Sequence, residues 1–173
     1  MTKYDFNKII DRRNTDCLKY DFAIQRVRPA DVLPFWVADM DFPIAREIQE
    51  ALIERCQHAV FGYSESTEAY FHAVRDWYTK HFNWSPKAEW LTKTPGIVFA
   101  LAMAVKAFTK KGEGVLVQQP VYYPFSEVIE DNERKLINSP LILKNGHYEM
   151  DFADLEEKIV ANNVKLILFM LTA

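Results

Sequence analysis

The sequence has few glycines, few cysteines and no long apolar run. Only five of its 173 residues are glycine, which argues against low complexity and disorder. Its two cysteines, Cys17 and Cys56, are too few for a disulfide framework and predict reduced thiols in a cytoplasmic protein. No segment approaches the ~20 apolar residues that span a bilayer. We therefore expect a folded cytoplasmic protein that makes no membrane contact.

Charge and missing motifs exclude several classes of function. A net charge of −3 gives neither nucleic acid nor a membrane surface an electrostatic attraction. The four histidines are scattered, without the spacing of metal ligands, so no metal site is expected. Phosphate-loop, dinucleotide-binding and Gly-x-Ser-x-Gly motifs are missing from the sequence.

Apolar periodicity predicts an α/β protein. Residues 1–35 show no sustained period and predict an irregular arm. Helices are predicted over 43–59, 67–82, 96–108, 124–132 and 151–160, with Pro43 in the first turn of the first and Asp151 capping the last. Strands are predicted over 114–118, 135–138, 140–143 and 164–171, with a tight turn at Asn145-Gly146. Apolar strands between helices indicate a parallel sheet covered on both faces. Because the sequence stops at the last strand, we expect part of a larger domain.

Two segments suggest a phosphorylated aromatic cofactor. Thr94-Pro95-Gly96-Ile97-Val98 begins a predicted helix, whose first N–H groups can bind a phosphate. The alternative is an ordinary capped helix. Tyr122-Tyr123 follows a predicted strand, at the sheet edge where ligands of open α/β sheets bind, and a tyrosine ring can stack on a flat ligand there. The alternative places both tyrosines in the core.

Two carboxylates precede the first predicted helix. Asp39 and Asp41 occupy alternate positions and could form a general acid–base pair. Carboxylates just before a helix more often cap it, so we expect Asp41 to cap the helix. The residues alone assign no role to Asp39.

Four segments together resemble a known family. They are Trp36–Phe42, Phe61–Tyr63, Thr94–Val98 and Gln119–Phe125, in this order. The chain resembles the N-terminal part of the pyridoxal-phosphate enzymes of the aspartate-aminotransferase fold (fold type I, class I/II aminotransferases), and within them the bacterial cystathionine β-lyase or cysteine-S-conjugate C–S lyase family. The resemblance implies an N-terminal arm with part of the small domain over 1–42, and the first, incomplete part of the cofactor-binding large domain over 43–173.

The resemblance also implies roles for cofactor-binding residues. Gly96, Ile97 and Val98 would present backbone N–H groups to the phosphate of pyridoxal 5'-phosphate. Tyr122 would stack on its pyridine ring. Tyr63 would reach the phosphate of the neighbouring subunit's cofactor, which implies a homodimer.

The resemblance further implies an amino-acid substrate whose carboxylate lies by Ala38 and Asp39. The reaction would convert an L-cysteine conjugate to pyruvate, ammonia and a thiol. The family's cofactor-bearing lysine matches no residue of this sequence, so we expect the 173-residue chain alone to be inactive. Two alternatives stay open: a class I/II aminotransferase, and a non-catalytic truncated or interaction protein.

Overall fold

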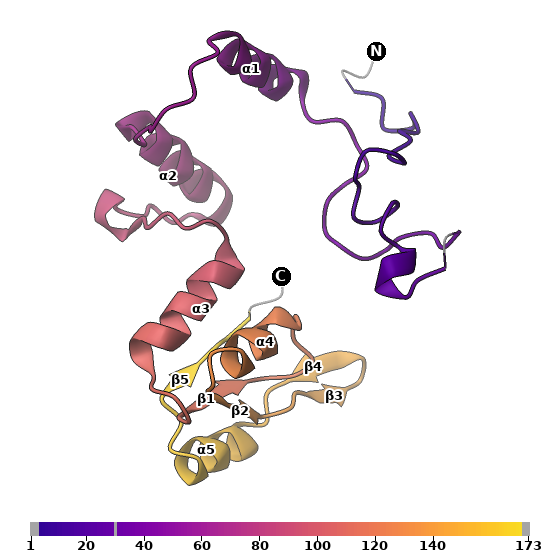
Figure 1. The fold of residues 1–173 in the computed structure, drawn as a ribbon. Coiled ribbons are helices and arrows are strands. Elements are labelled where there is room, and N and C mark those ends of the chain that lie inside the picture. Colours follow the sequence, from indigo (N-terminus) through magenta and orange to yellow (C-terminus); the bar gives the residue numbers. More distant parts are fainter. Residues whose placement is uncertain (1–3, 30, 171–173) are drawn as a thin grey trace. The chain divides into compact units, whose positions relative to one another are not determined.

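The computed structural model describes residues 4–29 and 31–170 of the chain. Its backbone divides into two compact units, Met1–Glu65 and Ser66–Ala173. Figure 1 follows the chain through its helices and strands. The domain boundary proposed between residues 42 and 43 stays a prediction.

The first unit is mostly irregular, as the sequence predicts. It contains the 3-10 helix η1 (Ile24–Arg26) and the α-helix α1 (Arg46–Gln57). Two expectations for α1 are wrong. The helix begins at Arg46 rather than in the turn of Pro43, because Ala45 is extended and forms the N-cap. Asp41 does not cap it, because its carboxylate is bound by basic side chains of the arm.

A carboxylate organises the arm near residue 17. The side chain of Asp21 accepts hydrogen bonds from the backbone N–H groups of Asn14 (2.9 Å), Thr15 (3.0 Å) and Cys17 (3.0 Å). These donors, Asn14 first, lower the pKa of Asp21. The thiol of Cys17 is buried and free of any disulfide.

The second unit begins with two helices joined by an aromatic segment. Helix α2 (Glu68–Phe82) is followed by the 3-10 helix η2 (Ala88–Trp90) and by α3 (Ile97–Phe108). The ring of Tyr78 meets that of Trp84 edge to face at 5.3 Å, and Trp84 stacks on Trp90 at 6.5 Å. These contacts link α2 to the connection that follows it.

The predicted parallel sheet is confirmed. Strands β2 (Lys135–Asn138), β1 (Gly114–Val117) and β5 (Leu166–Ile167) lie in the order β2-β1-β5, all parallel. Helices α4 (Pro124–Glu130) and α5 (Phe152–Ala161) lie on opposite sides of it (Figure 1). The expectation of helices on both faces is therefore correct.

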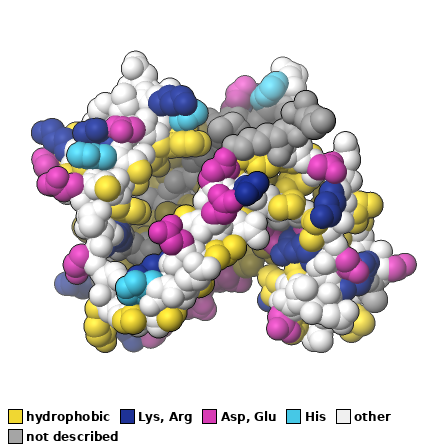
Figure 2. Space-filling view, turned by 90° about the horizontal axis from the view of Figure 1, so that it is seen from above, with side chains coloured by type: hydrophobic (Ala, Val, Ile, Leu, Met, Phe, Trp, Pro, Cys, Tyr) yellow, Lys and Arg dark blue, Asp and Glu magenta, His cyan; other side chains and the backbone are white. Residues whose placement is uncertain are grey.

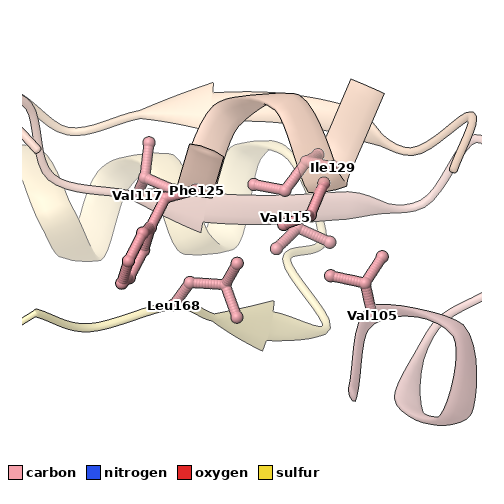
Figure 3. Close-up of a cluster of buried hydrophobic side chains, with 7 residues drawn as sticks. Val105, Val115, Val117, Phe125, Ile129 and Leu168 are labelled. Atoms are coloured by element: carbon pink, nitrogen blue, oxygen red, sulfur yellow. The ribbon is translucent and has the colours of Figure 1, made fainter. Parts of the chain in front are cut away.

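The core lies between the sheet, α3 and α4. Val115 and Val117 of β1 point to one face, because alternate residues of a strand do so. There they meet apolar side chains of α3, α4 and the segment after β5 (Figure 3): Val105, Phe125, Val128, Ile129 and Leu168. Leu116, of opposite orientation, is also fully buried.

The last predicted strand differs most from the structure. Instead of a buried strand over 164–171, β5 has two residues, and Ile167 is exposed. Residue 171 lies outside the described part. Backbone bonds from Lys165 to Gly114 and from Leu168 to Leu116 extend the contact beyond the strand. Within the described residues β5 pairs with β1 alone, so one neighbour covers it and only Leu168 becomes buried.

A hairpin and a capped helix follow β2. Strands β3 (Ile142–Lys144) and β4 (His147–Glu149) are antiparallel around Asn145-Gly146, whose φ angles of 51° and 81° are those of a tight hairpin turn. The tight turn is confirmed, although the sequence did not predict β4. The carboxylate of Asp151 accepts the N–H groups of Ala153 and Asp154, which confirms the predicted cap of α5.

Much apolar surface lies outside this core. Helices α1 and α2 contain no buried residue in the described part of the chain. Figure 2 shows hydrophobic side chains interspersed with charged ones on one face. Of the helices described, none is both long enough and apolar enough to span a membrane.

Candidate functional site

The entrance of α3 presents backbone N–H groups. Gly96 is the N-cap and has no side chain with which to cap the helix. The hydroxyl of Thr94 donates to the Gly96 carbonyl at 2.9 Å, so it holds the turn. Ile97 and Val98 are exposed. A Cβ placed on Gly96 would meet no described atom within 4 Å. This open helix start can accept an anion, since its N–H groups and dipole favour negative charge.

The turn after β1 is fixed by paired amides. Gln119 donates its backbone N–H to the Asn138 side-chain oxygen (3.1 Å), and Asn138 returns a bond to the Gln119 side chain (2.9 Å). The backbone carbonyl of Gln119 accepts the N–H of Leu141 at 2.7 Å. The turn leaving β1 is thereby held to β2 and to the chain that follows it.

Two exposed aromatic rings follow this turn. Tyr122 and Tyr123 are exposed, and their rings meet edge to face at 5.2 Å. The alternative that both are core residues is therefore wrong. An exposed tyrosine at the carboxyl end of a parallel strand can stack on a flat ligand.

A small cavity lies at the same edge of the sheet. It measures about 90 Å³ and is lined by residues that follow β1 and β5 and by two from the hairpin region: Gln118, Pro120, Val121, Leu141, Met150, Leu168, Phe169 and Met170. The side-chain nitrogen of Gln118 is buried and lacks a hydrogen-bond partner among the described residues. No sequence signal points to Gln118, because a glutamine at the end of an apolar run gives no distinct pattern.

The helix entrance predicted to bind the phosphate and the turn predicted to stack on the pyridine ring pack against the same apolar core. Leu101, one turn into α3, and Val121, next to Tyr122, pack against the same buried cluster. The helix entrance that starts at Gly96 and the Tyr122 turn are thus parts of one packed unit. Tyr63, Ala38 and Asp39 belong to the first unit. Their relation to the helix entrance stays a prediction.

Asp39 and Asp41 share two cations of the arm. Arg12 forms ion pairs of 2.6 Å with each carboxylate. Lys19 lies 3.1 Å from Asp41 and 3.6 Å from Asp39, and it donates to the Asp39 backbone carbonyl at 2.7 Å. The hydroxyl of Tyr20 donates to Asp41 at 3.3 Å. We call Arg12, Lys19, Asp39 and Asp41 the arm ion cluster.

This cluster decides against an acid–base pair. Bonding to Arg12 lowers the pKa of both Asp39 and Asp41 below their usual value. Both carboxylates are therefore ionised at neutral pH, whereas a general acid needs a raised pKa. No sequence signal points to Arg12 and Lys19, because the partners are at least 20 residues apart in the chain and no periodic pattern connects them.

The remaining site candidates are exposed. Tyr63 is fully exposed, and Ala38 is exposed beside Val37, whose φ of 63° is unusual for a β-branched residue.

The indole nitrogen of Trp36 is buried without a hydrogen-bond partner in the described ranges, and Arg28 lies 5.5 Å from its ring. No group of three metal-ligating side chains is found among the residues that the structure describes.

The parallel sheet, the uncapped helix start and the tyrosine turn define a part of the large domain of a type I pyridoxal-phosphate fold. Comparison with known sequences gives the family. The profile of the family described as aminotransferase class I and II matches residues 30–171, and the chain belongs to this family.

Curated relatives include two bacterial proteins. The chain is 42% identical over 164 residues to cystathionine beta-lyase PatB of Bacillus subtilis, a match that covers 95% of this chain and 42% of the relative. It is 30% identical over 166 residues to protein MalY of Escherichia coli, covering 95% of this chain and 43% of that protein. The chain thus spans less than half the length of these relatives.

Solved structures agree on the fold. Cystalysin of Treponema denticola, which contains a pyridoxal 5'-phosphate cofactor, superposes with a TM-score of 0.86 at 38% identity, over 96% of this chain and 43% of that one. The pyridoxal-phosphate-bound C–S lyase of Staphylococcus hominis gives a TM-score of 0.86 at 32% identity, over 95% and 42% of the two chains.

Proposed function

We propose that this chain forms the N-terminal part of a pyridoxal-phosphate-dependent C–S β-lyase of the cystathionine β-lyase type. The substrate would be an L-cysteine conjugate, and the products would be pyruvate, ammonia and a thiol. The observation that carries the proposal is the match to a cystathionine β-lyase at 42% identity over 95% of this chain. A class I/II aminotransferase is the second candidate, favoured by the family profile.

The second unit fits the cofactor at two points. The N–H groups at Gly96, Ile97 and Val98 would hold the phosphate, since the open helix start suits an anion. Tyr122 would stack on the pyridine ring, since its own ring is exposed. The bound cofactor would supply an electron sink for the carbanion at the substrate Cα. We assign no catalytic residue to this chain.

The first unit would supply substrate and dimer contacts. Ala38 and Asp39 would lie by the substrate carboxylate and contact it through the main chain. Tyr63 would bind the cofactor phosphate of the other subunit in a homodimer, which its full exposure supports. Free cysteines agree with the reducing cytoplasm as the site of action.

Adjacent tyrosines give a matched test of the cofactor role. The gene product that contains this chain is prepared unchanged, as Tyr122→Ala and as Tyr123→Ala. Pyridoxal-phosphate affinity is followed by absorbance. We expect Tyr122→Ala to weaken binding by about 0.5–1.5 kcal/mol or more, the value of a stacking contact, and Tyr123→Ala to leave it close to the unchanged protein. Equal losses in both variants would contradict the assignment to Tyr122.

Product analysis tests the reaction. L-cystathionine is added to the unchanged gene product, and pyruvate and thiol are measured with and without a keto-acid acceptor. A lyase releases both products without an acceptor. Turnover that requires the acceptor would identify an aminotransferase instead. If neither reaction occurs in the presence of the cofactor, the catalytic proposal fails and the non-catalytic alternative replaces it.

A further inference from the structure

The arm contains a buried lysine. The side chain of Lys19 is only 4% exposed. A buried ammonium group is costly unless it is paired and hydrogen-bonded. Among the described residues, Lys19 finds its partners in the segment of Asp39 and Asp41, where it donates to the Asp39 carbonyl and to the Asp41 carboxylate. The groups that stabilise the buried ammonium therefore lie in the segment that is proposed to contact the substrate carboxylate.

Arg12 binds the same segment from a second point. Its two terminal nitrogens reach one carboxylate each, Asp39 and Asp41, at 2.6 Å. One planar guanidinium therefore bridges two carboxylates that are two positions apart in the chain. The two cations and two anions balance, and the arm ion cluster has no net charge.

The clamped segment includes an unfavourable backbone conformation. Val37 has φ of 63°, in the left-handed region that a β-branched side chain rarely adopts. Such a conformation persists only where the surrounding structure imposes it, and it is concentrated at functional sites. Ala38 and Asp39 follow Val37 directly, so the direction of their main chain depends on this turn.

We propose that Lys19 and Arg12 are positioning residues, which hold the Val37–Asp39 turn and cancel the charge of Asp39 so that the segment can receive the α-carboxylate of an amino-acid substrate. This inference rests on the proposed function. Without the cations, the Asp39 carboxylate would repel an incoming carboxylate, and Val37 would be free to leave its strained conformation. Neither residue touches the substrate.

The test separates charge balance from folding. In the gene product that contains this chain, Lys19→Met is compared with Lys8→Met, an exposed lysine of the same arm. KM and kcat are measured for an S-alkyl-L-cysteine, and inhibition constants for the matching S-alkyl-cysteamine, which lacks the carboxylate. We expect Lys19→Met to raise KM about tenfold or more and to change kcat and the cysteamine constant less than about threefold. Lys8→Met should change none of them.

A double variant identifies the cause. Adding Asp41→Asn to Lys19→Met restores the charge balance, so KM should fall back toward that of the unchanged protein. A purely structural role predicts a further loss instead, which would overturn the inference. If Lys19→Met does not fold, Arg12→Gln with Arg13→Gln as its exposed control gives the same comparison.

The outcomes distinguish the two proposals. An active unchanged protein with an unaltered KM in Lys19→Met and Arg12→Gln overturns this inference and leaves the lyase proposal standing. Equal losses for the cysteine and cysteamine ligands also overturn it, because the effect would not concern the carboxylate. If the unchanged protein releases no thiol, the lyase proposal fails, and this inference fails with it.

Discussion

The arm of the first unit and the sheet of the second unit are held by different forces. In the sheet, Val115, Leu116 and Val117 of β1 are fully buried, and the two valines lie in an apolar cluster. In the arm, the few buried side chains include Lys19, and carboxylates accept bonds from Arg12 and from backbone N–H groups. The sheet therefore depends on shape and apolar area, whereas the arm depends on charge.

The two regions should therefore tolerate different kinds of substitution. Apolar burial does not depend on the protonation of side chains, but it is sensitive to their volume, because interiors are close-packed. Ion pairs and bonds to carboxylates are sensitive to protonation and less sensitive to volume. Substitutions that change side-chain volume should therefore destabilise the sheet, and substitutions that change charge should destabilise the arm.

The largest effect is expected from a cavity in the sheet. Leu116→Ala removes a fully buried side chain of the central strand, and we expect it to lower the unfolding free energy by about 2–5 kcal/mol. Leu143→Ala, in the exposed hairpin, should cost less than about 0.5 kcal/mol. Denaturant unfolding followed by circular dichroism measures both. Equal costs would show that the β1 core is not the stabilising element.

The next effect comes from adding volume. A Cβ on Gly114 would lie 3.2 Å from the backbone carbonyl oxygen of Asn162, which cannot move without α5. We expect Gly114→Val to cost about 1–3 kcal/mol. Gly62→Val is the matched change in the first unit, where a Cβ would meet no described atom within 4 Å. A Gly62→Val loss as large as that of Gly114→Val, in the same unfolding assay, would refute the contrast.

The sheet region is the part of the fold that the sequence predicts best. The apolar run of β1, the Asn145-Gly146 turn and the Asp151 cap depend on local patterns, and the structure confirms each. The family resemblance likewise gave the fold and the family. Turns, helix caps and short strands can be predicted from sequence because the residues that determine them lie within a few positions of one another.

The predictions are wrong where the interacting residues are far apart in the chain. Asp41 looked like a helix cap because it precedes α1, but Arg12 and Lys19 bind it from 29 and 22 residues away. Residues 164–171 looked like a buried strand because they are apolar, but burial depends on neighbouring strands rather than on composition. The assignments of Tyr63, Ala38 and Asp39 stay predictions for the same reason, since they depend on contacts beyond their own unit.

A smaller effect is expected from the cap of α5. Asp151→Ala removes the acceptor for the N–H groups of Ala153 and Asp154, and we expect a loss of about 1 kcal/mol. Asp151→Asn keeps a capping oxygen and should cost only a few tenths of a kcal/mol. Thermal unfolding compares the two. If the asparagine variant loses as much as the alanine variant, the charge rather than the hydrogen bonds stabilises the helix start.

Of these changes, acid is expected to have the smallest effect on the stability of the sheet. It should loosen the arm before it affects the apolar core of the sheet. Backbone N–H groups lower the folded-state pKa of Asp21. Arg12 and Lys19 lower the folded-state pKa values of Asp39 and Asp41. Their stabilisation is complete above the ordinary value of 3.8 and is lost as the pH falls through the lowered values.

We therefore expect no change in the arm between pH 8 and about 5, and its loosening below about 3.8, while the apolar core of β1 persists. Nuclear magnetic resonance can follow the amide protons of Asn14 and Thr15, which donate to Asp21, beside those of Val115 and Val117. Simultaneous loss of both sets would mean that one cooperative structure includes the arm and the sheet. Loss of the arm signals near pH 6 would assign the transition to groups other than these carboxylates.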